Sequence, residues 1–129
     1  MNLDFASVWE MISDIVPDND ALICGDEVVT WKEYDEKSSK IATALSAAGL
    51  QANSKAGLYL NNSNEYLIAQ NAIFKIGGIP INVNYRYVAE ELIYLLDNSD
   101  SEAVFYHACY SNRIKEIASS LPNIKAWIE

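Results

Sequence analysis

The sequence is poor in basic residues and in the residue types that carry catalytic or metal chemistry. Its 129 residues include one histidine, two cysteines and five glycines, and nine basic residues stand against eighteen acidic ones, for a formal net charge of -9. A surface this negative repels the phosphates of nucleic acids, so we expect no nucleic-acid partner. The acidic residues are spread along the chain without a long run, which indicates a solubilising surface.

The sparse cysteines and the lack of long hydrophobic runs indicate the cellular compartment of the protein. Cys24 and Cys109 lie far apart and outside any C-x-x-C motif, so we predict two buried, reduced thiols, with a disulfide or a metal pair as the alternative. The N-terminal stretch MNLDFASVWEMI has no basic region, unlike a signal peptide. No apolar run approaches the roughly 20 residues that cross a bilayer, so we predict no transmembrane segment and a cytoplasmic location.

The sequence also lacks the short motifs of the common nucleotide and hydrolase sites. It contains no G-x-x-x-x-G-K-[ST] phosphate loop, and the stretch NNSNEY after Leu60 has no glycine and so no dinucleotide fingerprint. No G-x-S-x-G elbow indicates a serine hydrolase, and no cluster has metal-ligand spacing. We therefore predict no catalytic residue and no metal site. His107 follows an expected strand, but a lone histidine is more often a surface or packing residue than a catalyst.

What is present is a regular succession of apolar patterns. Phe5 to Val16 has helical spacing and ends before Pro17. ALIC and EVVTW, on either side of Gly25-Asp26, predict a β-hairpin. Thr30 and Glu33 form a capping box that opens a helix through Ala48. After these come expected strands at Ala56–Leu60, Ile79–Val83, Ala103–Tyr106 and Lys125–Ile128, alternating with expected helices at Asn64–Ile76, Val88–Asn98 and Ser111–Leu121.

This order of elements predicts an α/β fold. We expect a mostly parallel sheet flanked by helices, with an N-terminal helix and a β-hairpin, and no linker within residues 1–129. Pro80 donates no ladder hydrogen bond, so we expect it at the start of a strand or in an edge strand. In the helix from Val88 to Asn98, the spacing predicts that Val88, Leu92, Leu95 and Leu96 face inward.

The segment KIGGIPINVNYRYVAEELIYLLDNSD, from Lys75 to Asp100, resembles the second conserved core region of the adenylate-forming enzymes. In that family a Lys-x-Gly-x-x-Pro-x-Asn stretch is followed by an arginine and a helix rich in Glu and Leu. The earlier segment VVTWKEYDEKSSKIATALSAAGL resembles the family's first T-[YW]-x-E-L helix, and the resemblance runs from about Phe5 to the end of the chain. INVNYRYVAEEL in particular is similar to bacterial fatty-acyl and steroid-side-chain CoA ligases.

The resemblance implies that residues 1–129 are the N-terminal portion of an AMP-binding (adenylation) domain, with the remainder of the enzyme absent. Members of this family activate a carboxylic acid with ATP and Mg²⁺ as an acyl-adenylate and then transfer the acyl group to coenzyme A. A small-molecule acid, with fatty acids favoured, is thus the implied substrate, and the remainder of the parent enzyme is the implied partner. The family's phosphate loop, adenosine contact, hinge and C-terminal lysine have no counterpart here, so we expect the segment alone to bind no cofactor and to be inactive.

Arg86 is the one residue with a cofactor-binding role implied by the resemblance. It matches an arginine that in some CoA ligases lies near the phosphates of coenzyme A. It also follows an expected strand, and a guanidinium offers a planar fork of donors suited to phosphate. The alternative is that Arg86 pairs with Glu90 and only fixes the loop. Many relatives have proline where this chain has Tyr85, so the loop can aim Arg86 differently.

Two other interpretations stay open beside the enzyme segment. One is a free-standing α/β module with a binding or scaffolding role, and the other is a small nucleotide-binding domain of another class. The chain stops at WIE, in or just after an expected strand, which favours a segment over a complete module. A segment of a larger domain is expected to expose a large apolar patch, or to bury it by self-association through an edge strand.

Overall fold

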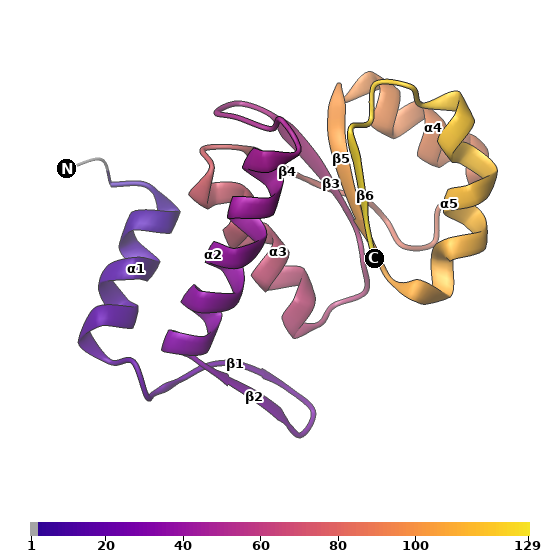
Figure 1. Cartoon of the computed structure of the whole chain (residues 1–129). Helices are drawn as coiled ribbons and strands as arrows, with labels where there is room; N and C mark the ends of the chain where they lie inside the picture. The colour runs from indigo at the N-terminus through magenta and orange to yellow at the C-terminus, as the bar shows by residue number, and fades with distance from the viewer. Residues whose placement is uncertain (1–2) are drawn as a thin grey trace.

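The computed structural model describes residues 3–129 as a hairpin and a sheet with helices packed around them (Figure 1). Helix α1 (Phe5–Ile15) leads into the strands β1 (Asp20–Cys24) and β2 (Glu27–Thr30) and then into α2 (Trp31–Ala47). The remaining elements are β3 (Lys55–Tyr59), α3 (Asn64–Lys75), β4 (Ile79–Asn82), α4 (Ala89–Asn98), β5 (Ser101–Tyr106), α5 (Ser111–Ile117) and β6 (Ala126–Ile128). Short 3-10 turns at Ala108–Tyr110 and Ala118–Ser120 flank α5.

Strands β3 to β6 form a four-stranded parallel sheet in the order β4-β3-β5-β6, while β1 and β2 pair antiparallel outside it. The predicted α/β fold, with a parallel sheet behind an N-terminal helix and hairpin, is confirmed. Pro80 lies in the edge strand β4, as predicted. Among residues 3–129, no helix combines the length and the apolar character that crossing a bilayer requires.

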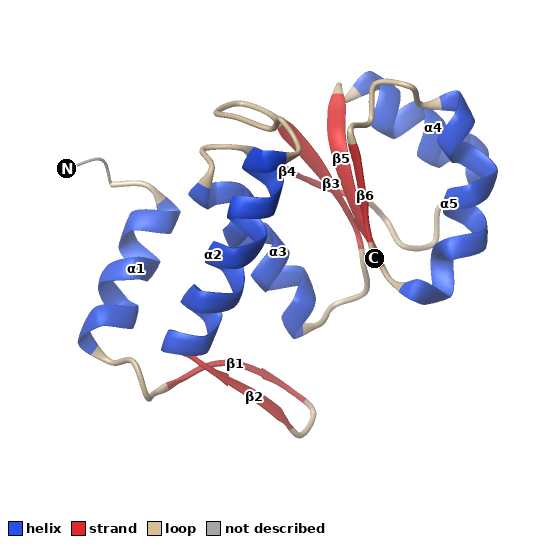
Figure 2. Cartoon of the chain, in the orientation of Figure 1, coloured by secondary structure: helices blue, strands red, loops and turns tan. Residues whose placement is uncertain are grey.

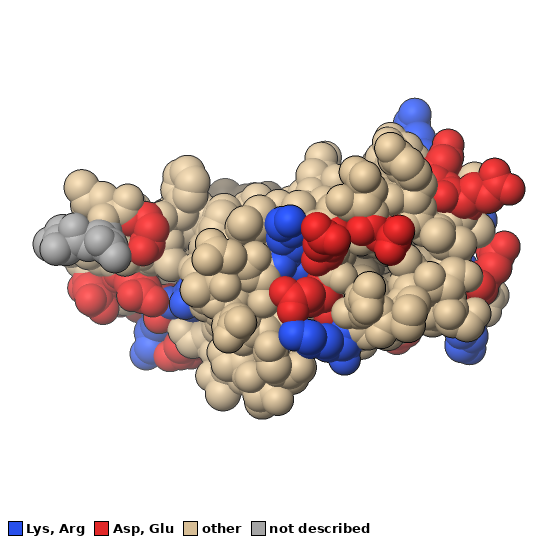
Figure 3. All heavy atoms as spheres, turned by 90° about the horizontal axis from the view of Figure 1, so that it is seen from above, with Lys and Arg blue, Asp and Glu red and all other residues tan. Residues whose placement is uncertain are grey.

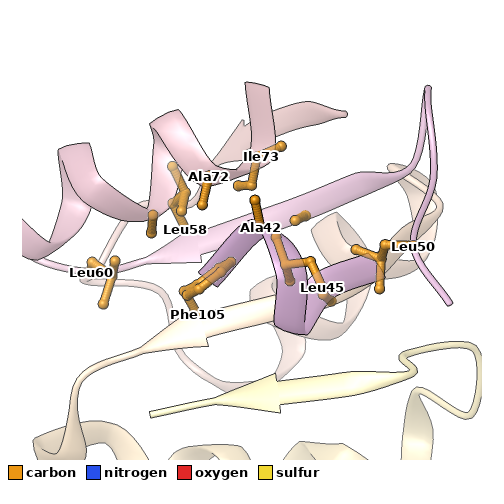
Figure 4. Close-up of a cluster of buried hydrophobic side chains, with 11 residues drawn as sticks. Ala42, Leu45, Leu50, Leu58, Leu60, Ala72, Ile73 and Phe105 are labelled. Carbon is orange, nitrogen blue, oxygen red and sulfur yellow. The ribbon is translucent and has the colours of Figure 1, made fainter. Parts of the chain in front are cut away.

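Helices cover both faces of the parallel sheet (Figure 2). On one face α2 and α3 pack on β3 and β5, where Leu45, Leu58, Ile73 and Phe105 belong to one buried cluster (Figure 4). On the other face α4 and α5 contribute a second cluster that includes Leu92, Leu96, Ile114, Ile117 and Val104. Helix α1 packs on α2 and α3 at the outside of the first layer. The two clusters bury the apolar faces of the helices, which is the main stabilising contribution to such a fold.

The capping box predicted at the start of α2 is present. The Thr30 hydroxyl accepts the Glu33 N–H at 3.3 Å, and the Glu33 carboxylate accepts the Thr30 N–H at 2.9 Å. The hydrogen bonds from the Thr30 backbone and hydroxyl hold the pKa of Glu33 below its ordinary value of 4.5. A lowered pKa means that the capping contribution is complete above that pH and is lost as the pH falls through the folded-state pKa. Gly49 follows the helix with a φ of +92°, in the left-handed region in which glycine commonly ends a helix.

Several details correct the sequence predictions. Cys24 and Cys109 are free thiols, but both are exposed rather than buried. Only one side of the two-stranded hairpin packs on the helices, and Cys24 lies at its exposed end, while Cys109 lies in the 3-10 turn after β5. Val88 is 51% exposed because it caps α4 instead of lying within its buried face. The helix predicted for Ser111–Leu121 is α-helical only to Ile117 and continues as a 3-10 turn.

Lys75 ties the three N-terminal helices together. Its ammonium group donates to Asp35 of α2 at 2.7 Å and also to Glu10 of α1, and its side chain is only 8% exposed. Burial alone would lower the pKa of Lys75, but the hydrogen bonds to Asp35 and Glu10 outweigh it and raise the pKa above 10.5. A raised pKa means that this stabilisation is fully present below about pH 10.5 and is lost only as the pH rises further.

We expect Lys75→Met to lower the free energy of unfolding by about 1.5–3 kcal/mol, because it removes hydrogen bonds between charged groups in a largely buried place. Lys55→Met is the matched control, since Lys55 and Asp100 form a longer and more exposed pair at 3.8 Å. That change should cost less than about 1 kcal/mol. Urea unfolding of the two variants at neutral pH measures the difference, and equal costs would contradict the bridging role of Lys75.

Candidate functional site

The carboxyl ends of the parallel strands meet along one edge of the sheet. Helix α3 leaves β3 on one face and α5 leaves β5 on the opposite face, so the winding direction switches between these two neighbouring strands (Figure 1). Open α/β sheets place their ligands beside such a point. The hydroxyl of Tyr110, after β5, donates to Asn61 Oδ1, after β3, at 2.8 Å and bridges the switch point.

Two hollows flank the strand ends, one on each face of the sheet. The hollow on the α4 and α5 face, called here the tyrosine-arginine hollow, has a volume of about 330 Å³. It is lined mainly by Tyr59, Tyr85, Arg86, Tyr87, Tyr110 and Arg113. The hollow on the α2 and α3 face has a volume of about 670 Å³ and a more apolar lining, which includes Ile68, Phe105 and Ile128. His107 lines this second hollow, so the structure separates it from Arg86.

Arg86 lies at the tip of the exposed loop between β4 and α4. The side-chain oxygen of Asn84 accepts the Arg86 N–H at 2.9 Å, and the Tyr87 N–H donates to the Asn84 carbonyl at 3.0 Å. These two hydrogen bonds form a tight turn that presents the Arg86 side chain outward. The guanidinium carbon lies 5.6 Å from the centroid of the Tyr85 ring. Among residues 3–129 no ion pair involves Arg86, so the alternative pairing with Glu90 is not formed.

The same loop is anchored to the body of the fold at the Tyr87 carbonyl. That oxygen accepts one hydrogen bond from the Tyr59 hydroxyl at 3.1 Å and another from Arg113 Nη1 at 3.4 Å. The Tyr59 and Tyr110 rings contact each other, with centroids 4.5 Å apart. Burial raises the pKa of Tyr59, so its hydroxyl stays a proton donor at neutral pH. Arg113 Nε also pairs with Glu116 at 3.5 Å.

Sequence reasoning did not single out Tyr59, Tyr110 or Arg113. One signal was available, because Tyr59 follows the small and aliphatic residues Ala56, Gly57 and Leu58 in a buried strand. A buried tyrosine hydroxyl needs a hydrogen-bond partner, which points to a polar contact at the end of that strand. The partner of the Tyr59 hydroxyl, Tyr87, lies 28 positions away in sequence, and Arg113 lies 26 positions from Tyr87, so no local pattern gives these contacts.

The side chains gathered at this edge of the sheet offer charge and aromatic surface for binding. Across residues 3–129, no group of three or more His, Cys, Asp or Glu side chains is placed to hold a metal ion. The tyrosine-arginine hollow offers aromatic surfaces and two guanidinium groups, which suit an anionic, partly aromatic ligand. On the face of the molecule seen in Figure 3, acidic side chains lie in several separate groups with basic ones between them, so no continuous acidic patch covers it.

Several curated CoA ligases are similar in sequence to nearly the whole of this chain. A medium/long-chain-fatty-acid–CoA/3-oxocholest-4-en-26-oate–CoA ligase of Mycobacterium marinum is 43% identical over 123 residues, covering 95% of this chain and 22% of the relative. A 3-oxocholest-4-en-26-oate–CoA ligase of Rhodococcus rhodochrous is 38% identical over 128 residues, covering 99% of this chain and 23% of the relative. The chain thus spans about a fifth of the length of these curated relatives.

Solved structures share the fold at lower sequence identity. The anthranilate CoA ligase AuaEII in complex with anthranoyl-AMP superposes with a TM-score of 0.90 and 20% identity, over 98% of this chain and 25% of that one. The N-terminal domain of FACL13 from Mycobacterium tuberculosis superposes with a TM-score of 0.89 and 22% identity, over 99% of this chain and 34% of that one. The sequence profile described as "AMP-binding enzyme" matches residues 13–128. The chain therefore belongs to the AMP-binding enzyme family.

Proposed function

We propose that the chain is the N-terminal segment of an ATP-dependent acyl-CoA ligase. The parent enzyme activates a carboxylic acid, favoured to be a medium- or long-chain fatty acid or another apolar acid, as an acyl-adenylate, and then transfers it to coenzyme A. The 43% identity to the Mycobacterium marinum ligase, along 95% of this chain, is the observation that carries the proposal. The compartment stays a sequence prediction, namely the cytoplasm.

The residues of this segment do not fit Mg²⁺ and ATP by themselves. A nucleotide triphosphate with its cation needs a phosphate cradle and oxygen ligands for the metal. The sequence contains no such phosphate loop, and residues 3–129 bring together no group of acidic or histidine ligands. The parts that hold Mg²⁺ and ATP are therefore proposed to lie in the remainder of the parent, which is the partner of this segment.

Coenzyme A fits the residues of this segment better than Mg²⁺ and ATP do, and the residue that suits it is Arg86. The guanidinium is exposed, forms no ion pair among residues 3–129 and lies on the tyrosine-arginine hollow. Its planar donors match a phosphate group, and its charge opposes the repulsion that a chain with a net charge of -9 exerts on an anionic cofactor. We propose that Arg86 binds a phosphate of coenzyme A.

The isolated chain of residues 1–129 is expected to form no acyl-adenylate. Its geometry supplies no site for Mg²⁺ and ATP, and catalysis that depends on positioned groups collapses without them. The measurement is pyrophosphate release from ATP in the presence of a fatty acid, which should equal the rate without protein. Clear acid-dependent release would contradict the expectation, and a specific ligand bound without any release would favour a free-standing binding module.

In the complete ligase, Arg86→Ala is expected to raise the KM for coenzyme A about tenfold, because a charge-assisted contact with phosphate is lost. Formation of the acyl-adenylate without coenzyme A should stay near the wild-type rate. Steady-state kinetics and pyrophosphate exchange measure the two half-reactions separately. Lys115→Ala is the control for net charge, since Lys115 is exposed on α5 and does not line the tyrosine-arginine hollow. A parallel fall of both half-reactions, or no change in either, would make Arg86 a structural residue.

The exposed apolar side chains support self-association of the isolated segment. Phe5, Val8, Met11 and Ile15 of α1 are between 37% and 73% exposed, and the edge strand β4 exposes Ile79. We expect the sedimentation coefficient of residues 1–129 to rise with concentration, and Ile79→Lys to reduce that rise because a charge on an edge strand opposes pairing. Tyr94→Lys is the control, because Tyr94 is 71% exposed but lies in helix α4 and on no strand edge. A monomer at every concentration would contradict edge-strand association.

A further inference from the structure

The Tyr87 carbonyl accepts hydrogen bonds from two donors that are distant in sequence from it and from each other. Tyr59 ends the central strand β3, and Arg113 lies in α5, yet the hydroxyl and the guanidinium converge on this single oxygen at 3.1 and 3.4 Å. The loop from Asn84 to Val88 also packs the Tyr87 side chain against the second cluster, and its Val88 N–H donates locally to Glu91 at 2.9 Å. This double hydrogen bond, called here the Tyr87 clamp, joins the backbone of the loop to β3 and α5.

Each donor of the Tyr87 clamp makes further contacts within the fold. Tyr59 is 2% exposed and belongs to a strand that pairs with a neighbour on each side. Its ring contacts Tyr110, whose hydroxyl donates to Asn61 at 2.8 Å. The guanidinium of Arg113 is held from its other side by Glu116. Both donors are thus oriented by contacts that do not involve the loop.

The tip of the loop is joined to the clamped oxygen through a closed turn. Arg86 directly precedes Tyr87, and the turn between Asn84 and Tyr87 is closed by its own hydrogen bonds at 2.9 and 3.0 Å. The turn therefore behaves as one unit, and its orientation is set where it is attached to the rest of the fold. A shift of the clamped carbonyl is passed on to the Arg86 backbone, and small misplacements of a binding group weaken the interaction that it makes.

We propose that Tyr59 and Arg113 are positioning residues, which hold the Tyr87 carbonyl and thereby aim Arg86 at coenzyme A. This inference rests on the proposed function, because it takes Arg86 as the contact to the cofactor. Tyr59 is the informative member of the pair. Tyr59 also lines the hollow, but it is uncharged and 2% exposed and its hydroxyl donates to the Tyr87 carbonyl, whereas Arg113 is partly exposed and brings a charge to the same hollow.

The test uses the complete ligase with Tyr59→Phe, which removes one hydroxyl, and with Tyr59→Phe combined with Arg113→Met. Tyr34→Phe is the matched control, because Tyr34 is 3% exposed and its hydroxyl also donates to a backbone carbonyl, that of Leu67, at 3.1 Å. We expect Tyr59→Phe to raise the KM for coenzyme A about fivefold, as the loss of one hydrogen bond allows, and the combined variant to raise it further. Acyl-adenylate formation should stay within about twofold of wild type in all three variants.

A double-mutant cycle separates positioning from a general structural effect. If Tyr59 acts through Arg86, then Tyr59→Phe adds no further rise in the KM for coenzyme A once Arg86→Ala is present. Amide hydrogen exchange of residues 84–88 gives a readout without any substrate, and it should be faster in the combined variant than in Tyr34→Phe.

The results distinguish a failure of the positioning role of Tyr59 from a failure of the proposed role of Arg86. An unchanged KM in Tyr59→Phe beside a raised KM in Arg86→Ala would overturn the inference and leave the proposed function standing. The same follows if the Tyr59→Phe effect persists in full on the Arg86→Ala background, or if amide exchange of the loop is unaltered in the combined variant. If Arg86→Ala itself leaves the KM for coenzyme A unchanged, the failure belongs to the proposed function, and the inference falls with it.

Discussion

The burial of β3 on both faces is the constraint on which the other elements depend. Ala56 and Leu58 belong to the cluster under α2 and α3, whereas Tyr59 belongs to the cluster under α4 and α5. Gly57 lies on the second face, where an added Cβ would come 2.9 Å from the side chain of Leu96. A strand enclosed in this way has no freedom to shift its register, because a shift by one residue would exchange the two sets of side chains. Its carboxyl end is therefore a fixed reference point, and the loops at the edge of the sheet are attached around it.

The sequence was a good guide to the elements and a weaker one to exposure. Periodicity and the capping signals of Thr30 and Glu33 identified the helices and strands, because those features are local. The predicted burial of Cys24 and Cys109 failed because cysteine is only on average a buried residue, and a two-stranded hairpin has a face with nothing to cover it. Val88 has the right spacing for the buried face of α4 but lies at its N-cap, where the chain direction has not yet become helical.

The candidate site was predictable in its location but not in its construction. Arg86 could be placed at the end of a strand from the pattern Ile79-Pro80-Ile81-Asn82 and the loop that follows. The Tyr87 clamp could not be predicted from the sequence, because it joins residues that only the strand order β4-β3-β5 brings together. The family resemblance also concerns a core motif and says nothing of the side chains behind it. The support of an exposed functional residue is a long-range property of the fold, even where the residue itself lies in a recognisable motif.

The order of the strands has a consequence for how the sheet is completed during synthesis. Strand β4 pairs with β3, β5 pairs with the free side of β3, and β6 pairs with β5. Every strand after the first thus joins an edge that has already left the ribosome, and none has to insert between two neighbours that are already paired. Helix α2 precedes both β3 and β5, on which it packs, and α3 precedes β5. The sheet can therefore grow outward from β3 in the direction of translation, with its most buried strand made first.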